Sequence, residues 1–563
     1  MKNNFQEKVS FIWSVADLLR GDYKASEYQN VILPLTVLKR LDAVLEPTKE
    51  KVLKRYQEFK KKLDRYDSLL KSVSGYPFYN TSKFTFKTLM QDPDNIAINL
   101  KNYINGFSRE MYDIIENFEF DKEIDKLNKA DLLYLLIEKF NSINLHPNSV
   151  ANHEMGTIFE ELIRKFSEQS NETAGEHFTP REVIQLMVKL IIAGNGGLKT
   201  PNIIKAIYDP ACGTGGMLTI AKNEITKNVN PSAKVFLYGQ ELNPKTYAIS
   251  KSDMLIKGEN ANNIKKGNSF SEDQLEDQKF DFMLSNPPYG VAWKKVAKQI
   301  RAEHENLGFD GRFGAGVPRI SDGSLLFLQH MISKMKPVSD GGSRIAIIFN
   351  GSPLFTGDAG SGESEIRKWI IENDWLELIV GLPNQLFYNT GIHTYIWIVT
   401  NNKAKEKQGK IQLIDARKMF EPMRKSLGNK RHYLSDDQIK KIVKIYKSFE
   451  NKGKSKIFEN SFFGYHKITV ERPQKDNKEK PDTSLRDNER IPLAQDIHEY
   501  FEKEVKPFVP DAWIDEKKTK VGYEINFTRY FYKYKPLRSL NEIENDIKKI
   551  QKETEKLMRE ISK

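Results

Sequence analysis

Residues 203–217, Ile-Ile-Lys-Ala-Ile-Tyr-Asp-Pro-Ala-Cys-Gly-Thr-Gly-Gly-Met, join a β-rich run to a glycine turn. The turn spans Asp209 to Gly216, and a helical run begins at Met217. Glycine is needed where the backbone turns tightly or touches a ligand with no Cβ in the way. Strand, turn and helix in this order predict an α/β fold in which the turn binds a ligand.

Short β-rich runs alternate with helical runs on both sides of this stretch. They cover residues 203–208, 235–238, 280–284, 344–349, 376–380 and 395–400. Such alternation predicts a Rossmann-like α/β domain with a mostly parallel sheet, which we assign to residues 166–470. Ligands of such sheets lie beyond the carboxyl ends of the strands, so motifs that follow strands should meet at one edge.

The rest of the chain reads differently. Residues 1–165 carry apolar side chains at helical spacing and predict an all-α domain. Residues 471–535 read as a polar linker and C-terminal extension, because 470–492 are rich in lysine, aspartate and asparagine. Residues 536–563 predict a helix whose apolar positions repeat as a heptad, at Leu540, Ile543, Ile547, Ile550, Thr554, Leu557 and Ile561. These apolar positions could pack on the rest of this chain. We favour the alternative, in which they form a coiled coil with another subunit.

Composition narrows the partners. The chain has 563 residues, a net charge of +12 and a pI near 9.1, which fits nucleic acid but equally a merely lysine-rich protein. Its single cysteine, Cys212, excludes an internal disulfide and fits the reducing cytoplasm. No apolar run is long enough for a membrane span, and the first residues lack a signal core.

The glycine turn matches neither the dinucleotide G-x-G-x-x-G pattern nor a phosphate-binding P-loop. A turn of this kind suits a cofactor without pyrophosphate, and S-adenosylmethionine is our candidate. Asp209, Gly213, Thr214, Gly215 and Gly216 would then contact it. Glu241, directly after the run 235–238, stands where an acid binds ribose hydroxyls.

A further element lies upstream, in Glu176-His177-Phe178-Thr179-Pro180-Arg181-Glu182. Thr179 suits a helix N-cap, Pro180 the first helical position, and Glu182 completes a capping box. The free amides of that helix start and the Phe178 ring would hold the methionine part of the cofactor. Capping alone also explains the pattern.

Asn286-Pro287-Pro288-Tyr289 follows the apolar run 280–284. The Asn286 oxygen and the Pro287 carbonyl can accept both hydrogens of an exocyclic amine and localise its lone pair. The prolines stiffen the turn, and the Tyr289 ring can stack on the target base. We therefore predict methyl transfer to an amine, driven by positioning and without a metal ion. Carbon-5 methylation of cytosine is disfavoured, because its nucleophilic cysteine is missing from this motif.

These motifs resemble those of the modification subunit of type I restriction–modification systems, an N6-adenine DNA methyltransferase. The resemblance rests on 175–181, 209–216, 239–243, 286–289 and 381–387, and on their order. It implies that Glu176 to Arg181, Thr214 to Gly216 and Glu241 contact S-adenosylmethionine, and that Asn286 to Tyr289 hold a flipped adenine. Glu176-His177 and Asn268 depart from the family pattern.

The resemblance also implies partners: double-stranded DNA, a specificity subunit bound through the C-terminal helix, a second copy of this chain and a restriction subunit. The segment 301–323, read as a flexible glycine-rich loop with Arg312 and Arg319, would contact the DNA backbone. Three alternatives remain open: a methyltransferase for protein glutamine or an RNA amine, a fused restriction–modification enzyme, and a cofactor-binding scaffold without catalysis.

Overall fold

The computed structural model describes residues 2–60, 66–170, 179–194, 196–388, 390–475, 480–534 and 537–561. It divides into two compact units, residues 1–525 and 526–563. None of the described helices combines the length and the apolar character that a bilayer crossing requires.

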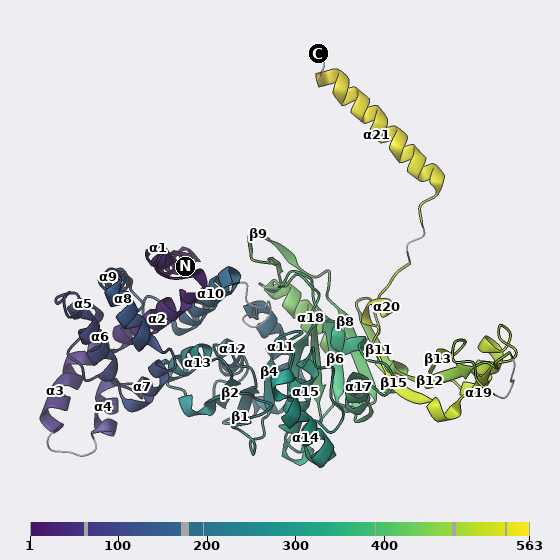
Figure 1. Cartoon of the computed structure of the whole chain (residues 1–563), viewed down its shortest axis with the longest axis horizontal. Coiled ribbons are helices and arrows are strands. Elements are labelled where there is room, and N and C mark those ends of the chain that lie inside the picture. Colours follow the sequence, from purple (N-terminus) through teal and green to yellow (C-terminus); the bar gives the residue numbers. More distant parts are fainter. Residues whose placement is uncertain are drawn as a thin grey trace. The chain divides into compact units, whose positions relative to one another are not determined.

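The N-terminal part of the first unit is helical, as predicted (purple and blue in Figure 1). Its helices are α1 (Lys2–Leu19), α2 (Gln29–Leu45), α3 (Lys49–Phe59), α4 (Asp67–Ser74), α5 (Phe86–Leu89), α6 (Ile96–Asn105), α7 (Arg109–Glu116), α8 (Phe120–Lys129), α9 (Leu133–Asn141) and α10 (Asn152–Ser170). The central helix α2 is buried along most of its length. Its Arg40 donates to the Val150 carbonyl and the Asn152 side chain, which fixes the start of α10.

A nine-stranded sheet forms the next layer, with the order β11-β8-β6-β7-β5-β4-β1-β2-β3. Its strands are β1 (Ile204–Asp209), β2 (Lys234–Glu241), β3 (Ile264–Lys266), β4 (Phe282–Ser285), β5 (Arg344–Phe349), β6 (Leu376–Gly381), β7 (Tyr395–Thr400), β8 (Lys410–Asp415) and β11 (Ser455–Glu459). The six predicted strands are confirmed, with ends that differ by a few residues. The pairing is parallel except at β7 and β11, so the sheet is the predicted mostly parallel one.

The strand order places a binding crevice between β1 and β4. From β1 the chain proceeds to β2 and β3 on one side, and β4 and β5 lie on the other. This reversal of direction opens a crevice at the carboxyl ends of the two strands, where ligands of open α/β sheets bind. Both sequence motifs, 209–216 and 286–289, begin where these two strands end.

Helices pack on the sheet and its edges: α11 (Arg181–Ala193), α12 (Gly216–Asn223), α13 (Pro244–Ile256), α14 (Ala297–Leu307), α15 (Ser324–Ser333), α16 (Ser352–Phe355), α17 (Gly362–Glu372) and α18 (Asp436–Ser448). One hydrophobic core joins the N-terminal helices, α11, α12 and one face of the sheet. Apolar contact of this extent holds the helical part and the sheet together.

A small antiparallel sheet follows, formed by β12 (Gly464–Glu471), β13 (Asp487–Pro492), β14 (Trp513–Ile514) and β15 (Lys520–Tyr523), with the short helix α19 (Ile497–Tyr500). Residues 487–492 therefore form a strand, whereas we predicted solvated linker over 470–492. The small sheet has its own core around Ile468, Ile491 and Phe501. Composition misled the prediction because β13 is exposed except at Ile491.

The second unit contains α20 (Phe527–Tyr530) and α21 (Leu540–Ile561). The predicted terminal helix is confirmed. Its apolar side chains Leu540, Ile543, Ile547, Ile550 and Leu557 are exposed. An apolar stripe of this kind on an otherwise charged helix is a surface suited to association.

Candidate functional site

The glycine turn has the backbone geometry that its composition requires. Gly213 and Gly215 adopt left-handed conformations, with φ of 54° and 78°, and Gly215 precedes α12. A Cβ on Gly215 would lie 2.8 Å from the Ser250 hydroxyl oxygen, so only glycine fits there. A Cβ on Gly213 would meet no atom within 4 Å, so that side of the turn is open. The turn thus presents bare backbone to a ligand.

Glu241 lies at the end of β2 and contacts this turn. Its carboxylate accepts hydrogen bonds from the Gly213 amide, at 2.9 Å, and from the Asn243 amide, at 2.7 Å. A carboxylate is a side chain that can accept hydrogen bonds from hydroxyl groups, as the predicted ribose contact of Glu241 requires. The structure brings the predicted residues Gly213 and Glu241 together.

Asp209 is the last residue of β1, and its side chain forms hydrogen bonds within the glycine turn and to β4. Its buried carboxyl accepts from the Ala211 amide and from the Ser285 hydroxyl, both at 3.0 Å. Burial raises the pKa of Asp209 to about 7, although these two hydrogen bonds oppose the rise. Asp209 therefore holds the turn rather than facing the ligand directly, and it connects the turn to β4.

The Asn286 turn follows β4 directly. Pro287 is buried, and Asn286, Pro288 and Tyr289 are partly exposed. The Tyr289 hydroxyl donates to the side-chain oxygen of Asn286. Burial raises the pKa of Tyr289 well above its usual range, so the hydroxyl keeps the proton that it donates. The predicted acceptor is thus held in place by a residue of the same motif.

Ser285 links the two turns, and our sequence analysis did not single it out. Its hydroxyl donates to Asp209, while its backbone pairs with Ile347 of β5. β1 and β4 are also paired directly, with Tyr208 opposite Met283. The sequence feature that could have identified Ser285 is its position at the end of a buried strand, immediately before Asn286.

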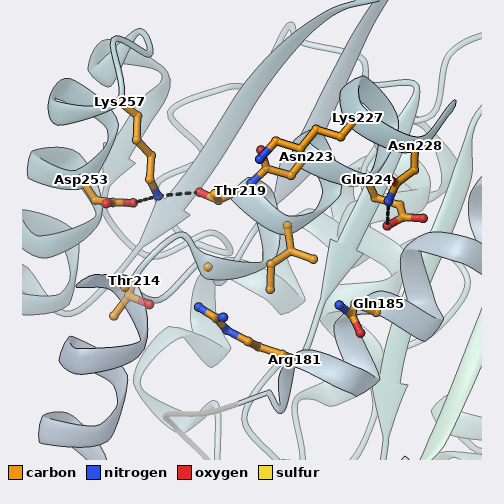
Figure 2. A pocket seen from close by; sticks show the side chains of 13 residues that line it. Arg181, Gln185, Thr214, Thr219, Asn223, Glu224, Lys227, Asn228, Asp253 and Lys257 are labelled. Carbon is orange, nitrogen blue, oxygen red and sulfur yellow. Dashed lines mark hydrogen bonds and ion pairs between the residues drawn. The ribbon is translucent and has the colours of Figure 1, made fainter. Parts of the chain in front are cut away.

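A cavity of about 280 Å³ extends from the glycine turn along α12 (Figure 2). Three predicted residues, Arg181, Thr214 and Gly216, line it, together with Gly156, Gln185, Thr219, Ile220, Asn223, Glu224, Lys227, Asn228, Asp253 and Lys257. Figure 2 shows Arg181 and Gln185 on one side, across from a group in which Lys257 bonds Asp253 and, at 3.0 Å, the Thr219 hydroxyl. The positions 216, 219, 220 and 223 share one face of α12, a periodicity that would have identified them.

The upstream element is described from Thr179 onward. Helix α11 begins at Arg181 with Pro180 at the N-cap, one residue later than we predicted. The predicted capping box is not formed, because the N-cap is Pro180, without a side-chain cap, and the Glu182 carboxylate binds Lys430 instead. Glu176, His177 and Phe178 lie outside the described residues, so their predicted contacts with a cofactor stay predictions.

The segment 301–323 differs from its predicted form. Much of it belongs to α14 and the turn after it, and it is not a free glycine loop. Arg312 donates to both oxygens of Glu303 and to the carbonyls of Ser269 and Phe270. The prediction that Arg312 reaches DNA is therefore wrong, because its guanidinium is bound inside the protein. Arg319 is exposed.

The residues fit S-adenosylmethionine. Backbone without side chains at Gly213, an adjacent carboxylate at Glu241 and the cavity beside Thr214 suit a compact nucleoside with hydroxyl groups. A cation such as a sulfonium is also compatible with a turn flanked by Glu241. The glycine turn and the Asn286 turn follow the neighbouring strands β1 and β4, while the cavity beside Thr214 is lined by neither Glu241 nor Asn286.

Two family models match the chain. The model for N-6 DNA methylases matches residues 150–463, and the model for the HsdM N-terminal domain matches residues 8–140. The first match contains the glycine turn, Glu241 and the Asn286 turn, and the second covers most of the helical part.

Curated relatives and a solved structure agree with these matches. The MjaIX type I restriction enzyme methylase subunit of Methanocaldococcus jannaschii is 26% identical over 453 residues, which cover 78% of this chain and 77% of that protein. The HindI methylase subunit of Haemophilus influenzae is 32% identical over 271 residues, or 48% of this chain and 55% of that one. The crystal structure of a type I restriction–modification methyltransferase subunit from Streptococcus thermophilus matches with a TM-score of 0.63 and 25% identity, over 81% of this chain and 96% of that chain.

Proposed function

This chain belongs to the N-6 DNA methylase family, and on that premise we propose which of its residues bind the cofactor and which bind the adenine during methyl transfer. The family match and the methylase-subunit relatives make it an adenine-specific DNA methyltransferase of the type I restriction–modification class. They do not favour the alternatives of a protein-glutamine or RNA methyltransferase.

The cofactor site that we propose consists of the glycine turn, Glu241 and the start of α11. Gly213 to Gly216 offer backbone to S-adenosylmethionine, and Glu241 binds the ribose hydroxyls. Arg181, Thr179 and Pro180 border the methionine part, and Glu176, His177 and Phe178 are assigned to the same part by resemblance. When bound, the cofactor supplies an electrophilic methyl group on sulfur.

Asn286 and the Pro287 carbonyl take the two amine hydrogens of a flipped adenine. Accepting both hydrogens localises the nitrogen lone pair, so the amine becomes a nucleophile. Tyr289 supplies a face on which the base stacks, as aromatic residues do in enzymes that extrude their target base. Pro287 and Pro288 stiffen the turn so that the acceptors keep their positions. After transfer, the surplus proton leaves from nitrogen to solvent.

The observation that carries this proposal is the direct contact between the two turns. The Ser285 hydroxyl, at 3.0 Å from Asp209, joins the residue before Asn286 to the residue that begins the glycine turn. A donor held by one turn and an amine held by the other would therefore be neighbours.

The function is tested by mapping N6-methyladenine across the host genome, with and without this gene and its neighbours. We expect methylated adenines at one sequence motif in the intact strain and none there when this gene alone is deleted. Unchanged methylation after the deletion, with every other methyltransferase gene of the strain removed, would contradict the function.

For the partners, we propose that α21 docks on the coiled coil of a specificity subunit flanked by two copies of this chain, with a restriction subunit in the full complex and double-stranded DNA as substrate. The exposed stripe of α21 supports this role. We also propose residues 1–165, 166–470, 471–535 and 536–563 as the functional divisions of the chain.

Removal of residues 540–563 should weaken assembly and spare the fold. Burying apolar side chains of this size contributes about 1.5–3 kcal/mol each, so losing the stripe should weaken subunit affinity at least about a hundredfold. The melting temperature of the first unit should not change, because α21 belongs to the second compact unit. Calorimetry and size-exclusion chromatography with the specificity subunit measure both.

A matched pair of full-length variants controls for the deletion. Ile543→Ser/Ile547→Ser alters the stripe, whereas Lys548→Ser/Lys552→Ser alters the charged face of the same helix. Only the first pair should weaken assembly. Undiminished co-elution of the truncated chain, or equal loss with both pairs, would refute docking through the stripe.

A further inference from the structure

A separate two-stranded hairpin protrudes beside the sheet, formed by β9 (Glu421–Leu427) and β10 (Lys430–Tyr433). Nearly all of β9 is exposed on both of its faces. Figure 1 shows β9 as a green ribbon that extends away from β6 and β8. Burial of apolar surface therefore does not account for strand β9.

The turn of the hairpin and strand β10 are anchored to the rest of the protein. The amides of Arg431 and His432 donate to the Gln385 carbonyl, and the Asn429 amide donates to the Tyr388 carbonyl. The His432 ring stacks on Phe420 at a centroid distance of 3.8 Å. The Lys430 ammonium lies buried, where it binds Glu182 of α11 and the Leu386 carbonyl at 2.9 Å. These contacts hold β10 and the turn against the protein and leave β9 as the exposed strand of the hairpin.

These anchors place the hairpin at the catalytic edge. Residues 384–388 follow β6, and β6 runs parallel to β5 because both are antiparallel to β7. β5 is in turn parallel to β4, so β6 ends at the same edge as the strand before Asn286. The hairpin and the Asn286 turn therefore lie at the same edge of the sheet, where β6 and β4 end.

The hairpin region is strongly basic. Lys418, Arg424, Lys425 and Arg431 are exposed, and in the described parts of the chain no carboxylate forms an ion pair with any of the four. The nearby cations Arg417 and Lys430 pair with Asp415 and Glu182, so they are structural. Glu421 is the one acid of the hairpin itself. Unpaired cations on a projecting ribbon attract a polyanion.

We propose that the β9–β10 hairpin binds the sugar-phosphate backbone of the double-stranded DNA beside the adenine that is methylated. The proposal rests on the proposed function. A two-stranded ribbon fits the major groove of B-DNA, about 12 Å wide. Arg424 and Lys425, in the exposed middle of β9, would contact phosphates and hold the register of the duplex.

The charges have one simpler explanation. Lysine and arginine on an exposed edge strand prevent pairing with other chains, so they would then serve solubility alone. That explanation requires no dependence of DNA affinity on these residues. The two explanations therefore differ in a quantity that can be measured.

The test uses the assembled methyltransferase with its specificity subunit and a duplex that carries its recognition site. Dissociation constants are measured by fluorescence anisotropy across a range of salt concentrations for wild type, Arg424→Gln/Lys425→Gln and the matched control Lys51→Gln/Lys54→Gln on α3. We expect the hairpin variant to bind about tenfold more weakly at ~0.15 M salt and to lose about two units from the slope of log K against log salt, since each phosphate contact contributes about 0.9.

The control carries the same charge change on exposed lysines of the helical part and should match wild type. Cofactor affinity, measured by calorimetry, shows that the hairpin variant is folded. An unchanged salt slope overturns the proposal. Weakened assembly with an unchanged slope also overturns it and assigns the hairpin to a protein partner. Methyl transfer to adenine by the wild-type complex is scored separately, so failure of the proposed function is told apart from failure of the hairpin.

Discussion

Replacing Asn286 by alanine is expected to lower methyl transfer to adenine by about 10²–10³-fold or more, the range seen when one fixed polar group that acts on the reacting centre is removed. The side-chain oxygen of Asn286 accepts one amine hydrogen in the proposed site, and alanine offers no acceptor. Cofactor affinity should stay close to wild type, because the glycine turn is held by Glu241 and Asp209. Single-turnover assays with labelled cofactor measure the first quantity and calorimetry measures the second.

A second substitution at the same position separates chemistry from packing. Asn286→Asp retains an acceptor oxygen of the same reach, so it should keep more activity than alanine. Tyr289 donates to this oxygen in the present structure, and that bond is preserved with aspartate. An alanine variant that loses cofactor binding and unfolds, with no recovery in aspartate, would mean that Asn286 is structural.

The largest loss of stability is expected from Glu377→Ala. Glu377 lies in β6, 1% exposed, and accepts two hydrogen bonds from Arg344 of β5, at 2.9 and 3.2 Å. Lys407 is 3.3 Å away, and the Tyr446 hydroxyl donates to the same carboxylate. Alanine would leave the buried cations Arg344 and Lys407 without a counterion. Removing one partner of a buried pair costs about 3–5 kcal/mol, measurable by chemical denaturation.

The same group predicts how stability depends on pH. Burial, the largest single effect, would raise the pKa of Glu377, but the charges of Arg344 and Lys407 and the hydrogen bonds from Arg344 and Tyr446 together outweigh it and lower that pKa to about 2. A carboxyl whose pKa is depressed by folding stabilises the protein fully above its ordinary pKa of about 4.5. That stabilisation is lost as the pH falls from about 4.5 toward 2. The alanine variant should lack this part of the acid sensitivity.

Asp125→Ala provides the comparison, because Asp125 pairs with Lys101 at the surface and its side chain is 59% exposed. A surface pair contributes at most about 1 kcal/mol. If Glu377→Ala and Asp125→Ala lower the free energy of unfolding equally, the buried network does not stabilise the sheet.

The sequence predicted the sheet well because its strands are buried. Residues 344–349, 376–381 and 395–400 are buried at every position, so apolar runs with β-branched residues mark them clearly. The hairpin β9–β10 and strand β13 escaped prediction for the opposite reason. They are mostly exposed, so no apolar run marks them, and the hairpin is held by contacts with distant residues such as 385 and 388.

The site was predicted in part. Strand-end motifs identified Gly213, Glu241 and Asn286, since backbone conformation and chemistry restrict these residue types. Ser285, Gln185 and Thr219 were missed because a serine, a glutamine or a threonine has no distinctive local pattern. The role of Arg312 was predicted wrongly, because its ion pair with Glu303 forms only in the folded chain and has no marker in the sequence.

The contact of Ser285 with Asp209 has a consequence for how the reaction begins. The two turns follow the paired strands β1 and β4, so the spacing between the glycine turn and Asn286 is set by the fold of the sheet, before either molecule arrives. Less ordering of these two turns is then needed on binding, and extrusion of the adenine from the duplex becomes the larger rearrangement before transfer.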